Sequence, residues 1–160
     1  MINLLSKKPE EIERFRAAPW PFQRTFKTPL KGLNRFVAIL LAPFFLEKGS
    51  LSSDEVVFEP ENLFHLMTIN SVQVENYWEL NLTVEGQREI AVLLEAALGD
   101  WVDFVFVPTP ELFAIYADHD EYVTFYAPNQ PNLLSLVSDL ERAGFEIVDY
   151  MRGASEGKWR

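Results

Sequence analysis

Four adjacent polar residues, Asp118, His119, Asp120 and Glu121, are the side chains of this sequence best suited to chemistry, and they interrupt the stretch FAIYADHDEYVTFY, residues 113–126. Carboxylates beside a histidine raise the pKa of the imidazole and tune it for acid/base catalysis. Carboxylate and imidazole groups are also ligands of divalent metal ions. Because aromatic and β-branched residues flank the run on both sides, a third interpretation is the charged tip of a β-hairpin.

The hairpin interpretation accounts for every residue of the stretch. If His119 and Asp120 are the two central turn residues, Ala117 faces Tyr122, and both faces of the ribbon gain the aromatic or β-branched pairs that stabilise antiparallel strands. Asp and His tolerate the positive φ of such a turn better than most residues do. We therefore expect an exposed, charged tip.

The spacing argues against a catalytic or metal site at this tip. Neighbouring residues of an extended chain point to opposite sides, so at most two of the four can share a metal ion, whereas a metal site needs three or four ligands. The other histidine, His65, lies among apolar neighbours in ENLFHLMTIN and is expected to be partly buried; it could form a metal pair with His119 only if the fold brings the two together. We predict no catalytic residue, no metal site and no cofactor. The residues predicted to bind a partner are Asp118, His119, Asp120, Glu121 and Tyr122.

Tyrosines crowd the same hairpin at positions 116, 122 and 126. Aromatic stripes on strands usually belong to a core, so we expect these rings to be buried, near Trp78 and Trp101. Tyrosine and tryptophan are also favoured anchors of binding surfaces, because they join a large apolar area to a polar tip.

The net charge of −10 is unevenly distributed along the chain. Residues 1–35 carry eight basic and three acidic groups, a net charge of +5, whereas residues 36–150 carry three basic and twenty acidic groups, a net charge of −17. An acidic body of this kind repels nucleic acid and attracts basic proteins. We expect the basic N-terminal segment to pack on the acidic body, and we expect no nucleic-acid partner.

Length and composition indicate one domain that folds without disulfides. The 160 residues are 48% apolar and include no cysteine, which excludes a disordered chain, a disulfide scaffold and a Cys-ligated zinc site. The longest apolar run, residues 36–46, is too short to cross a bilayer and is interrupted by Pro43, so no membrane partner is expected. The first residues lack the apolar core of a secretory signal, which predicts a cytoplasmic protein.

The N-terminal part of the chain combines one clear helix with ambiguous segments. Residues 9–18 are predicted to form a helix that begins with proline and glutamates and ends with arginines. Residues 20–32 are expected to be an irregular basic arm, and the polar composition of residues 47–55 predicts a loop. Residues 33–46 fit both a helix and a buried strand, and we favour the strand. Residues 55–60 fit a short strand.

The chain from residue 76 onward has clearer patterns. YWELNLTV, WVDFVFVP, ELFAIYA, EYVTFYA and FEIVDY are predicted to be strands. Two helices are predicted, over VEGQREIAVLLEAALG, with Thr83 as N-cap and Gly99 at the end, and over PNLLSLVSDLERAG, which ends at Gly144. The resulting order is β-α-β-β-β-α-β. Without one strand of the meander, this is the order of the ferredoxin-like split motif.

These elements predict an α+β fold, a mostly antiparallel sheet with helices on one face. The chain is expected to be a single domain, residues 1–160. Its predicted parts are a basic N-terminal arm with a short helix over residues 1–34, an acidic α+β body over residues 35–150, and a frayed tail over residues 151–160.

Binding of another protein is the function that these observations favour. The hypothesis is an inhibitor or immunity-type partner of a basic, nuclease-like protein, because an acidic surface can occupy a site built for phosphates. Two alternatives stay open. One is a small metal-dependent or acid/base enzyme that uses Asp118, His119 and Asp120. The other is a subunit of a larger assembly whose basic arm reaches a neighbour.

Overall fold

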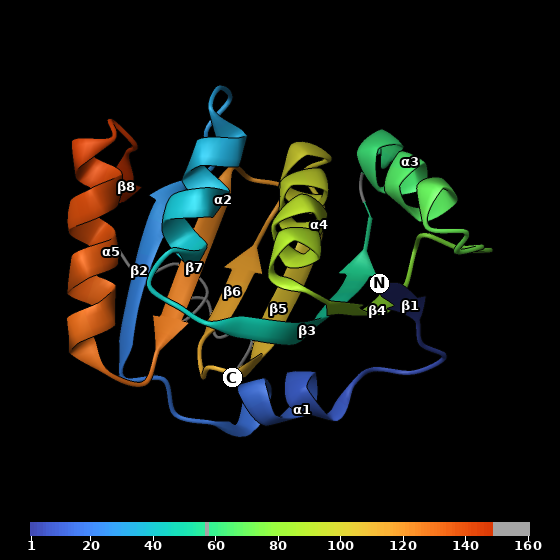
Figure 1. Ribbon diagram of the computed structural model, residues 1–160, viewed down its shortest axis with the longest axis horizontal. Coiled ribbons are helices and arrows are strands. Elements are labelled where there is room, and N and C mark those ends of the chain that lie inside the picture. The colour runs from blue at the N-terminus through green and yellow to red at the C-terminus, as the bar shows by residue number, and fades with distance from the viewer. Residues whose placement is uncertain (57, 149–160) are drawn as a thin grey trace.

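The computed structural model describes residues 1–56 and 58–148, and within them the chain alternates helices and strands (Figure 1). The elements in chain order are β1 (Ile2–Leu4), α1 (Glu10–Ala17), β2 (Phe22–Lys27), α2 (Leu33–Leu41), β3 (Leu46–Glu55), α3 (Glu61–Ile69), β4 (Leu80–Glu85), α4 (Gln87–Gly99), β5 (Asp103–Pro110), β6 (Ala114–Ala117), β7 (Tyr122–Ala127), α5 (Gln130–Arg142) and β8 (Ile147–Val148).

The strands form one eight-stranded sheet in the order β1-β4-β3-β5-β6-β7-β2-β8. Every neighbouring pair is antiparallel. The predicted α+β class, with helices packed against an antiparallel sheet, is therefore confirmed.

Two strands from the N-terminal half are inserted into the C-terminal half. The predicted β-α-β-β-β-α-β order is present as β4 to β8. In the sheet, however, β3 lies between β4 and β5, and β2 lies between β7 and β8. Each crossover helix, α4 and α5, therefore joins two strands that are separated by a strand from earlier in the chain.

One face of the sheet carries the main hydrophobic core. Helices α2, α3, α4 and α5 all contribute buried side chains to it, and they lie on the same side of the sheet (Figure 1). The sheet contributes alternate residues such as Phe104, Phe106 and Phe125, which are fully buried. This is the burial expected of a strand whose successive side chains point to opposite faces.

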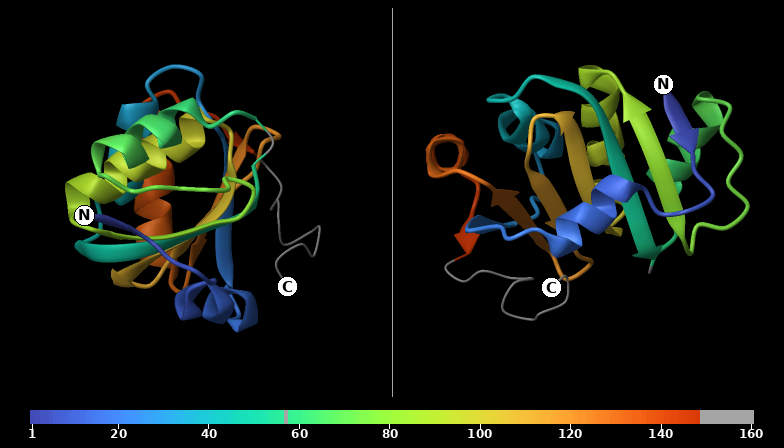
Figure 2. Two further views of the ribbon diagram at one scale, coloured as in Figure 1. Left: turned by 90° about the vertical axis from the view of Figure 1, so that its right-hand side faces the viewer. Right: turned by 90° about the horizontal axis from the view of Figure 1, so that it is seen from below.

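The opposite face is covered by α1, which lies on the other side of the sheet from α3 and α4 (Figure 2). Ile12 and Phe15 of α1 pack with Trp20 against Val105 and Tyr126. The Phe15 and Tyr126 rings meet edge to face with their centroids 5.2 Å apart. The prediction of helices on one face thus holds for α2 to α5, whereas α1 makes a second, smaller core.

Residues 33–41 form helix α2, so the favoured strand interpretation of this segment was wrong. One face of this helix is buried. It carries two pairs of residues that are about one turn apart, Phe36 with Leu40 and Val37 with Leu41. The helix ends at Leu41, two residues before Pro43, which cannot donate the backbone hydrogen bond that would continue it.

The predicted irregular arm contains an interior strand of the sheet. β2 pairs with β7 on one side and with β8 on the other. The hydroxyl groups of Thr25 and Thr124 lie 2.9 Å apart across the β2–β7 pair. The basic segment also contacts acidic groups as expected, since Lys8 and Arg16 both bind the Asp54 carboxylate, at 3.0 and 3.2 Å.

The predicted loop at residues 47–55 is strand β3, near the middle of the sheet. Its serines are buried, and hydrogen bonds of their hydroxyl groups offset the cost of removing these groups from water. The Ser52 hydroxyl donates to the Asn81 side-chain oxygen over 2.6 Å, and that of Ser50 donates to Glu11 over 3.3 Å. Composition alone does not reveal such partners. The short strand expected at residues 55–60 is not formed in its described part, because β3 ends at Glu55 and α3 begins at Glu61.

The C-terminal elements agree closely with the sequence patterns. The predicted inward residues of α4, Ile90, Leu93, Leu94 and Ala97, are buried. Its N-cap is Gly86 rather than Thr83, which lies within β4. Gly144 follows the end of α5 with a positive φ of 90°, as a C-terminal glycine does. The tail predicted at residues 151–160 lies outside the described residues.

Substitution of Gly49 by alanine is expected to destabilise the fold. Gly49 lies in β3 opposite Val84 and Pro108, and a Cβ atom there would overlap the Phe106 ring. Overpacking of this kind costs about 1–3 kcal/mol. Urea denaturation of Gly49→Ala and the wild type measures the loss, and an unchanged midpoint would contradict the close packing of β3 on Phe106.

Candidate functional site

The hairpin exists, but its register differs by one residue from the predicted one. Ala117 pairs with Val123 rather than with Tyr122. The Asp118 N–H donates to the Tyr122 carbonyl over 3.1 Å, so the loop consists of three residues, 119–121, and Glu121 takes the positive φ of 79°. This is the three-residue hairpin with a left-handed third position. A shift of one residue turns each β7 side chain to the opposite face.

Asp118 is part of the scaffold of the loop. Its side chain is buried, and its carboxylate accepts hydrogen bonds from the backbone N–H groups of Asp120 and Tyr122, at 2.8 and 3.3 Å. Asp120 and Glu121 are the exposed acids of the tip, while His119 and Tyr122 are half-buried. The expectation that all four charged residues are presented to solvent is therefore wrong for Asp118.

His119 is held by Asp103, a residue that the sequence analysis did not select. The Asp103 carboxylate accepts the His119 backbone N–H over 2.7 Å and lies 3.0 Å from Nδ1 of the ring. Asp103 is itself buried at the start of β5, beside the end of β6. An acidic residue at the first position of an apolar strand was the available signal, but its partner lies sixteen residues away.

The pKa of His119 is raised above its ordinary value of 6.5. The main cause is the hydrogen bond with Asp103, with further contributions from the negative charges of Asp103, Asp120 and Asp118, and partial burial opposes them. A raised pKa favours the protonated imidazolium. Protonation suits an ion pair and weakens His119 as a general base near neutral pH.

His65 does not join this cluster into a metal site. It lies on α3 with its side chain exposed, which corrects the expected partial burial. Within residues 1–56 and 58–148, no group of three or more His, Asp or Glu side chains is placed to hold a metal ion.

The hairpin tyrosines divide between core and surface. Tyr116 and Tyr126 are buried in the core beneath α1, as expected, whereas Tyr122 is half-buried. The aromatic partners of Tyr126 are Phe15 and Trp20 rather than the predicted Trp78, which is exposed.

Helix α3 is a second candidate feature, and sequence analysis missed it as a helix. Asp100, just after α4, anchors its first turn by accepting the backbone N–H groups of Asn62 and Leu63, at 3.0 and 2.8 Å, and the Asn62 amide at 2.8 Å. Burial raises the pKa of Asp100, and these hydrogen bonds oppose the rise. A carboxylate at a helix N-terminus accepts hydrogen bonds from backbone N–H groups, and its negative charge interacts favourably with the helix dipole.

The segment formed by α3 and the loops on both sides of it, residues 58–79, presents large apolar side chains to solvent; we call it the α3 surface. Phe58, Phe64, Ile69 and Trp78 are between 52% and 65% exposed. The Phe64 and Tyr77 rings lie 6.5 Å apart, which brings the loop that carries Trp78 to the helix. The segment contains no Asp, Lys or Arg, and its four glutamates are all exposed: Glu59, Glu61, Glu75 and Glu79.

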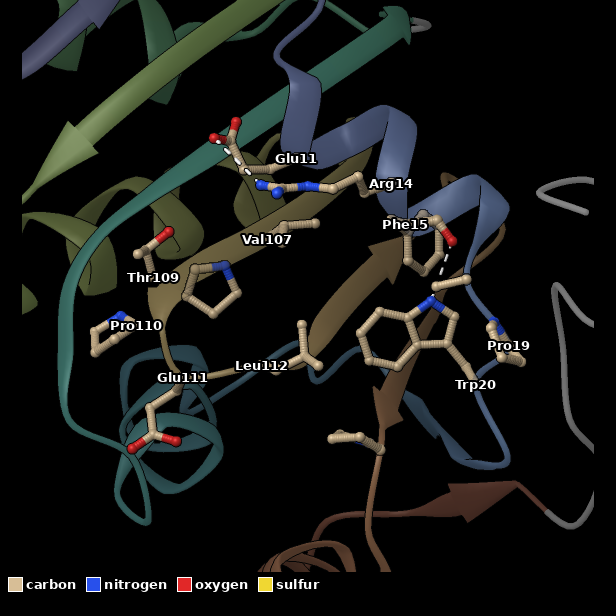
Figure 3. A pocket seen from close by; sticks show the side chains of 13 residues that line it. Glu11, Arg14, Phe15, Pro19, Trp20, Val107, Thr109, Pro110, Glu111 and Leu112 are labelled. Atoms are coloured by element: carbon tan, nitrogen blue, oxygen red, sulfur yellow. Dashed lines mark hydrogen bonds and ion pairs between the residues drawn. The ribbon is translucent and has the colours of Figure 1, made fainter.

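A cavity of about 380 Å³ lies at the other end of β5, between α1 and the segment that leads to β6 (Figure 3). Phe15, Trp20 and Val107 form much of its apolar lining, and Arg14 and Glu111 also line it. The Trp20 indole N–H donates to the Phe15 carbonyl over 3.1 Å, which fixes the ring.

Comparison with family models, with curated protein sequences and with solved structures finds no significant match for this chain. Among the helices of the described residues, none is long and apolar enough to cross a membrane.

Stability is expected to fall as the pH rises through the folded-state pKa of His119. A histidine whose pKa is raised by folding contributes stability that is complete below the unfolded value, about 6.5, and is lost above the folded value. Urea denaturation from pH 5.5 to 9 should show this loss in the wild type and a smaller one in Asp103→Asn and in His119→Gln. Equal pH dependence in all three proteins would contradict the Asp103–His119 pair.

Loss of the Asp100 carboxylate is expected to release α3. Asp100→Ala leaves the buried N–H of Leu63 without its acceptor, which costs about 1–3 kcal/mol. Amide hydrogen exchange should accelerate in residues 61–69 more than in α5, which serves as an internal control. Uniform acceleration would indicate global destabilisation instead.

Proposed function

We propose that this protein binds a basic protein partner through the α3 surface. The observation that carries the proposal is the combination of four exposed large apolar residues with four exposed glutamates and no lysine or arginine between residues 58 and 79. Aromatic anchors surrounded by a polar rim are the usual anatomy of a protein interface. The acidic rim favours a basic partner.

The negative charge extends beyond the α3 surface. Residues 58–102 carry eight acidic groups and one basic group, Arg88. Asp100 binds the first turn of α3, and three residues later Asp103 binds His119, so the hairpin tip and the start of α3 are both tied to the start of β5. The negative electrostatic potential of these carboxylates attracts a basic protein toward the surface and raises its association rate.

The hairpin tip adds exposed charge and, like the first turn of α3, is anchored near the start of β5. Asp120 and Glu121 are exposed; the Asp120 carboxylate lies 3.6 Å from the His119 ring Nε2, and the Glu121 carboxylate lies 4.0 Å from the Lys27 ammonium group. His119 and Tyr122 are half-buried flanking positions. Asp118 contributes by holding the loop rather than by direct contact.

An inhibitor or immunity-type role toward a nuclease-like protein is the form of this proposal that the charge favours. Such targets present basic clefts for phosphates, and clustered carboxylates can occupy them. The acid/base enzyme alternative receives less support, because His119 is biased toward its protonated form. The assembly alternative remains a prediction from the basic N-terminal segment.

The test compares capture of a partner by the wild type and by a Phe64→Ala/Trp78→Ala variant. Lysate of the source cell is applied to each immobilised protein at low and at moderate salt. We expect one basic protein at stoichiometric ratio on the wild type, released by salt. Once that partner is purified, calorimetry should show a loss of about 2 kcal/mol or more in the variant, as for interface hot spots.

A matched control removes an exposed apolar side chain elsewhere. Leu134→Ala lies on α5 and should leave the affinity unchanged. Charge reversal at Asp120 and Glu121 should mainly slow association. A partner whose affinity is insensitive both to salt and to the Phe64→Ala/Trp78→Ala change would overturn the proposal.

A further inference from the structure

An open cavity of about 590 Å³ lies at one edge of the sheet, between the loop that joins β2 to α2 and the segment that joins α5 to β8 (Figure 1). Small-molecule sites occupy roughly 300–1,000 Å³. The backbone around this cavity is fixed by two hydrogen bonds. The Lys27 N–H donates to the Glu146 carbonyl over 3.0 Å, and the Thr28 N–H donates to the Glu121 carbonyl over 2.8 Å.

Three basic side chains line the cavity, Lys27, Lys31 and Arg35, together with one carboxylate, that of Glu146. Among the described residues, Lys31 and Arg35 make no ion pair and no side-chain hydrogen bond, although both belong to or adjoin the basic segment that was expected to pack on the acidic body. Lys27 makes one loose ion pair, 4.0 Å from Glu121. The cluster therefore offers uncompensated positive charge in a protein whose net charge is −10.

Helix α2 begins at this cavity, where Gly32 and Arg35 are lining residues. The Phe36 N–H donates to the Gly32 carbonyl over 3.0 Å, so the N–H groups of residues 33–35 precede the intrahelical hydrogen bonds. No side chain caps them, and the first turn contains no acidic residue. The positive end of a helix dipole with free N–H groups favours a bound anion such as phosphate.

Thr28 is independent evidence that a ligand belongs in this cavity. It is a lining residue and only 3% exposed, yet its hydroxyl group has no hydrogen-bond partner among the described residues. A buried hydroxyl group without a partner is unfavourable and uncommon. An anion oxygen held between the start of α2 and the basic side chains would accept this hydrogen bond.

We propose that this cavity binds the phosphate group of a phosphomonoester. The phosphate oxygens would accept hydrogen bonds from Lys31, Arg35 and the Thr28 hydroxyl, and from the first N–H groups of α2. Arginine suits a phosphate because its planar donors match two oxygens. The organic part of the ligand would lie against Leu30 and Phe145, which contribute to the apolar lining.

The local charges favour a phosphate over a cation. A phosphomonoester carries two negative charges above pH 7, because its second pKa is about 6, and the basic side chains of the lining can match both. The end of α5 also borders the cavity, but the carbonyls of residues 139–141 already accept the N–H groups of residues 143–145. Repulsion from the more distant acidic groups is largely screened beyond about 8 Å at physiological ionic strength.

The test is a titration of the ¹⁵N-labelled full chain, above pH 7, with phenyl phosphate and with phenyl sulfate, which has a similar shape and one negative charge fewer. The backbone N–H signals of residues 28 and 33–35 report on the cavity. We expect saturable shifts of these signals with phenyl phosphate, at a Kd about tenfold lower than for phenyl sulfate, because the second negative charge gains a further basic partner. Equal Kd values for the two probes would overturn the proposal.

Variants separate a specific site from general charge. Lys31→Gln/Arg35→Gln should raise the Kd of phenyl phosphate about tenfold or more. The matched control, Lys48→Gln/Arg88→Gln, removes one lysine and one arginine from exposed positions outside the cavity and should leave the Kd unchanged. Thr28→Val should weaken binding without lowering the midpoint of urea denaturation, because no described residue bonds the lost hydroxyl. Equal effects of the two double variants would contradict the site.

A vesicle assay distinguishes a soluble phosphomonoester from a lipid headgroup. Co-sedimentation of the full chain is measured with phosphatidylcholine vesicles that contain or lack phosphatidic acid, whose headgroup is a phosphomonoester. Co-sedimentation only with phosphatidic acid, abolished in Lys31→Gln/Arg35→Gln, would place the phosphate on a lipid, next to Leu30, which is 81% exposed. Shifts with phenyl phosphate and no co-sedimentation would place it on a soluble ligand. The absence of both would overturn the proposal.

This site goes beyond the proposed function, and the two can fail independently. The cavity lies beside β2 and β8, whereas the α3 surface lies toward the opposite edge of the sheet, beside β1 and β4 (Figure 1). The Phe64→Ala/Trp78→Ala variant, which tests binding of a partner protein, should therefore leave the phenyl phosphate titration unchanged.

Discussion

The alternation of apolar side chains along β5 is the constraint on which the other features depend. Phe104 and Phe106 point into the main core, and Val105 and Val107 point into the core beneath α1. Because both faces of this strand are apolar, both must be removed from water. Helices α2 to α5 cover one face, and α1 with Trp20 covers part of the other.

The features of the candidate functional site lie at the two ends of that doubly covered strand. At its start, Asp100 holds the first turn of α3 and Asp103 holds His119. At its end, the chain turns toward β6 and leaves the cavity against α1. Both arrangements place surface groups on segments fixed by buried partners, so side chains offered to a partner or ligand need little ordering on binding.

Sequence reasoning succeeded where periodicity reflects burial and failed where burial depends on distant partners. Helices α4 and α5 were predicted correctly, because each buries one regularly spaced apolar face against the adjacent sheet. β3 was assigned to a loop because its serines look solvated, yet Ser52 is satisfied by Asn81, 29 residues away. The hairpin residues were identified, but the register and the buried role of Asp118 follow from the left-handed conformation of Glu121. α3 was missed because its exposed apolar residues blur the amphipathic pattern on which a helix assignment rests.

Local sequence patterns are sufficient to predict the α+β class, the order of the C-terminal elements, the acidic body and the presence of a charged hairpin. These properties depend on local periodicity and composition, which are additive along the chain. The folded structure was needed to show that β2 and β3 are inserted among later strands, that Asp103 contacts His119, and that Phe64 and Trp78 are exposed. Such facts depend on contacts between residues far apart in sequence, and no local pattern encodes which distant group will satisfy a buried polar atom or cover an apolar one.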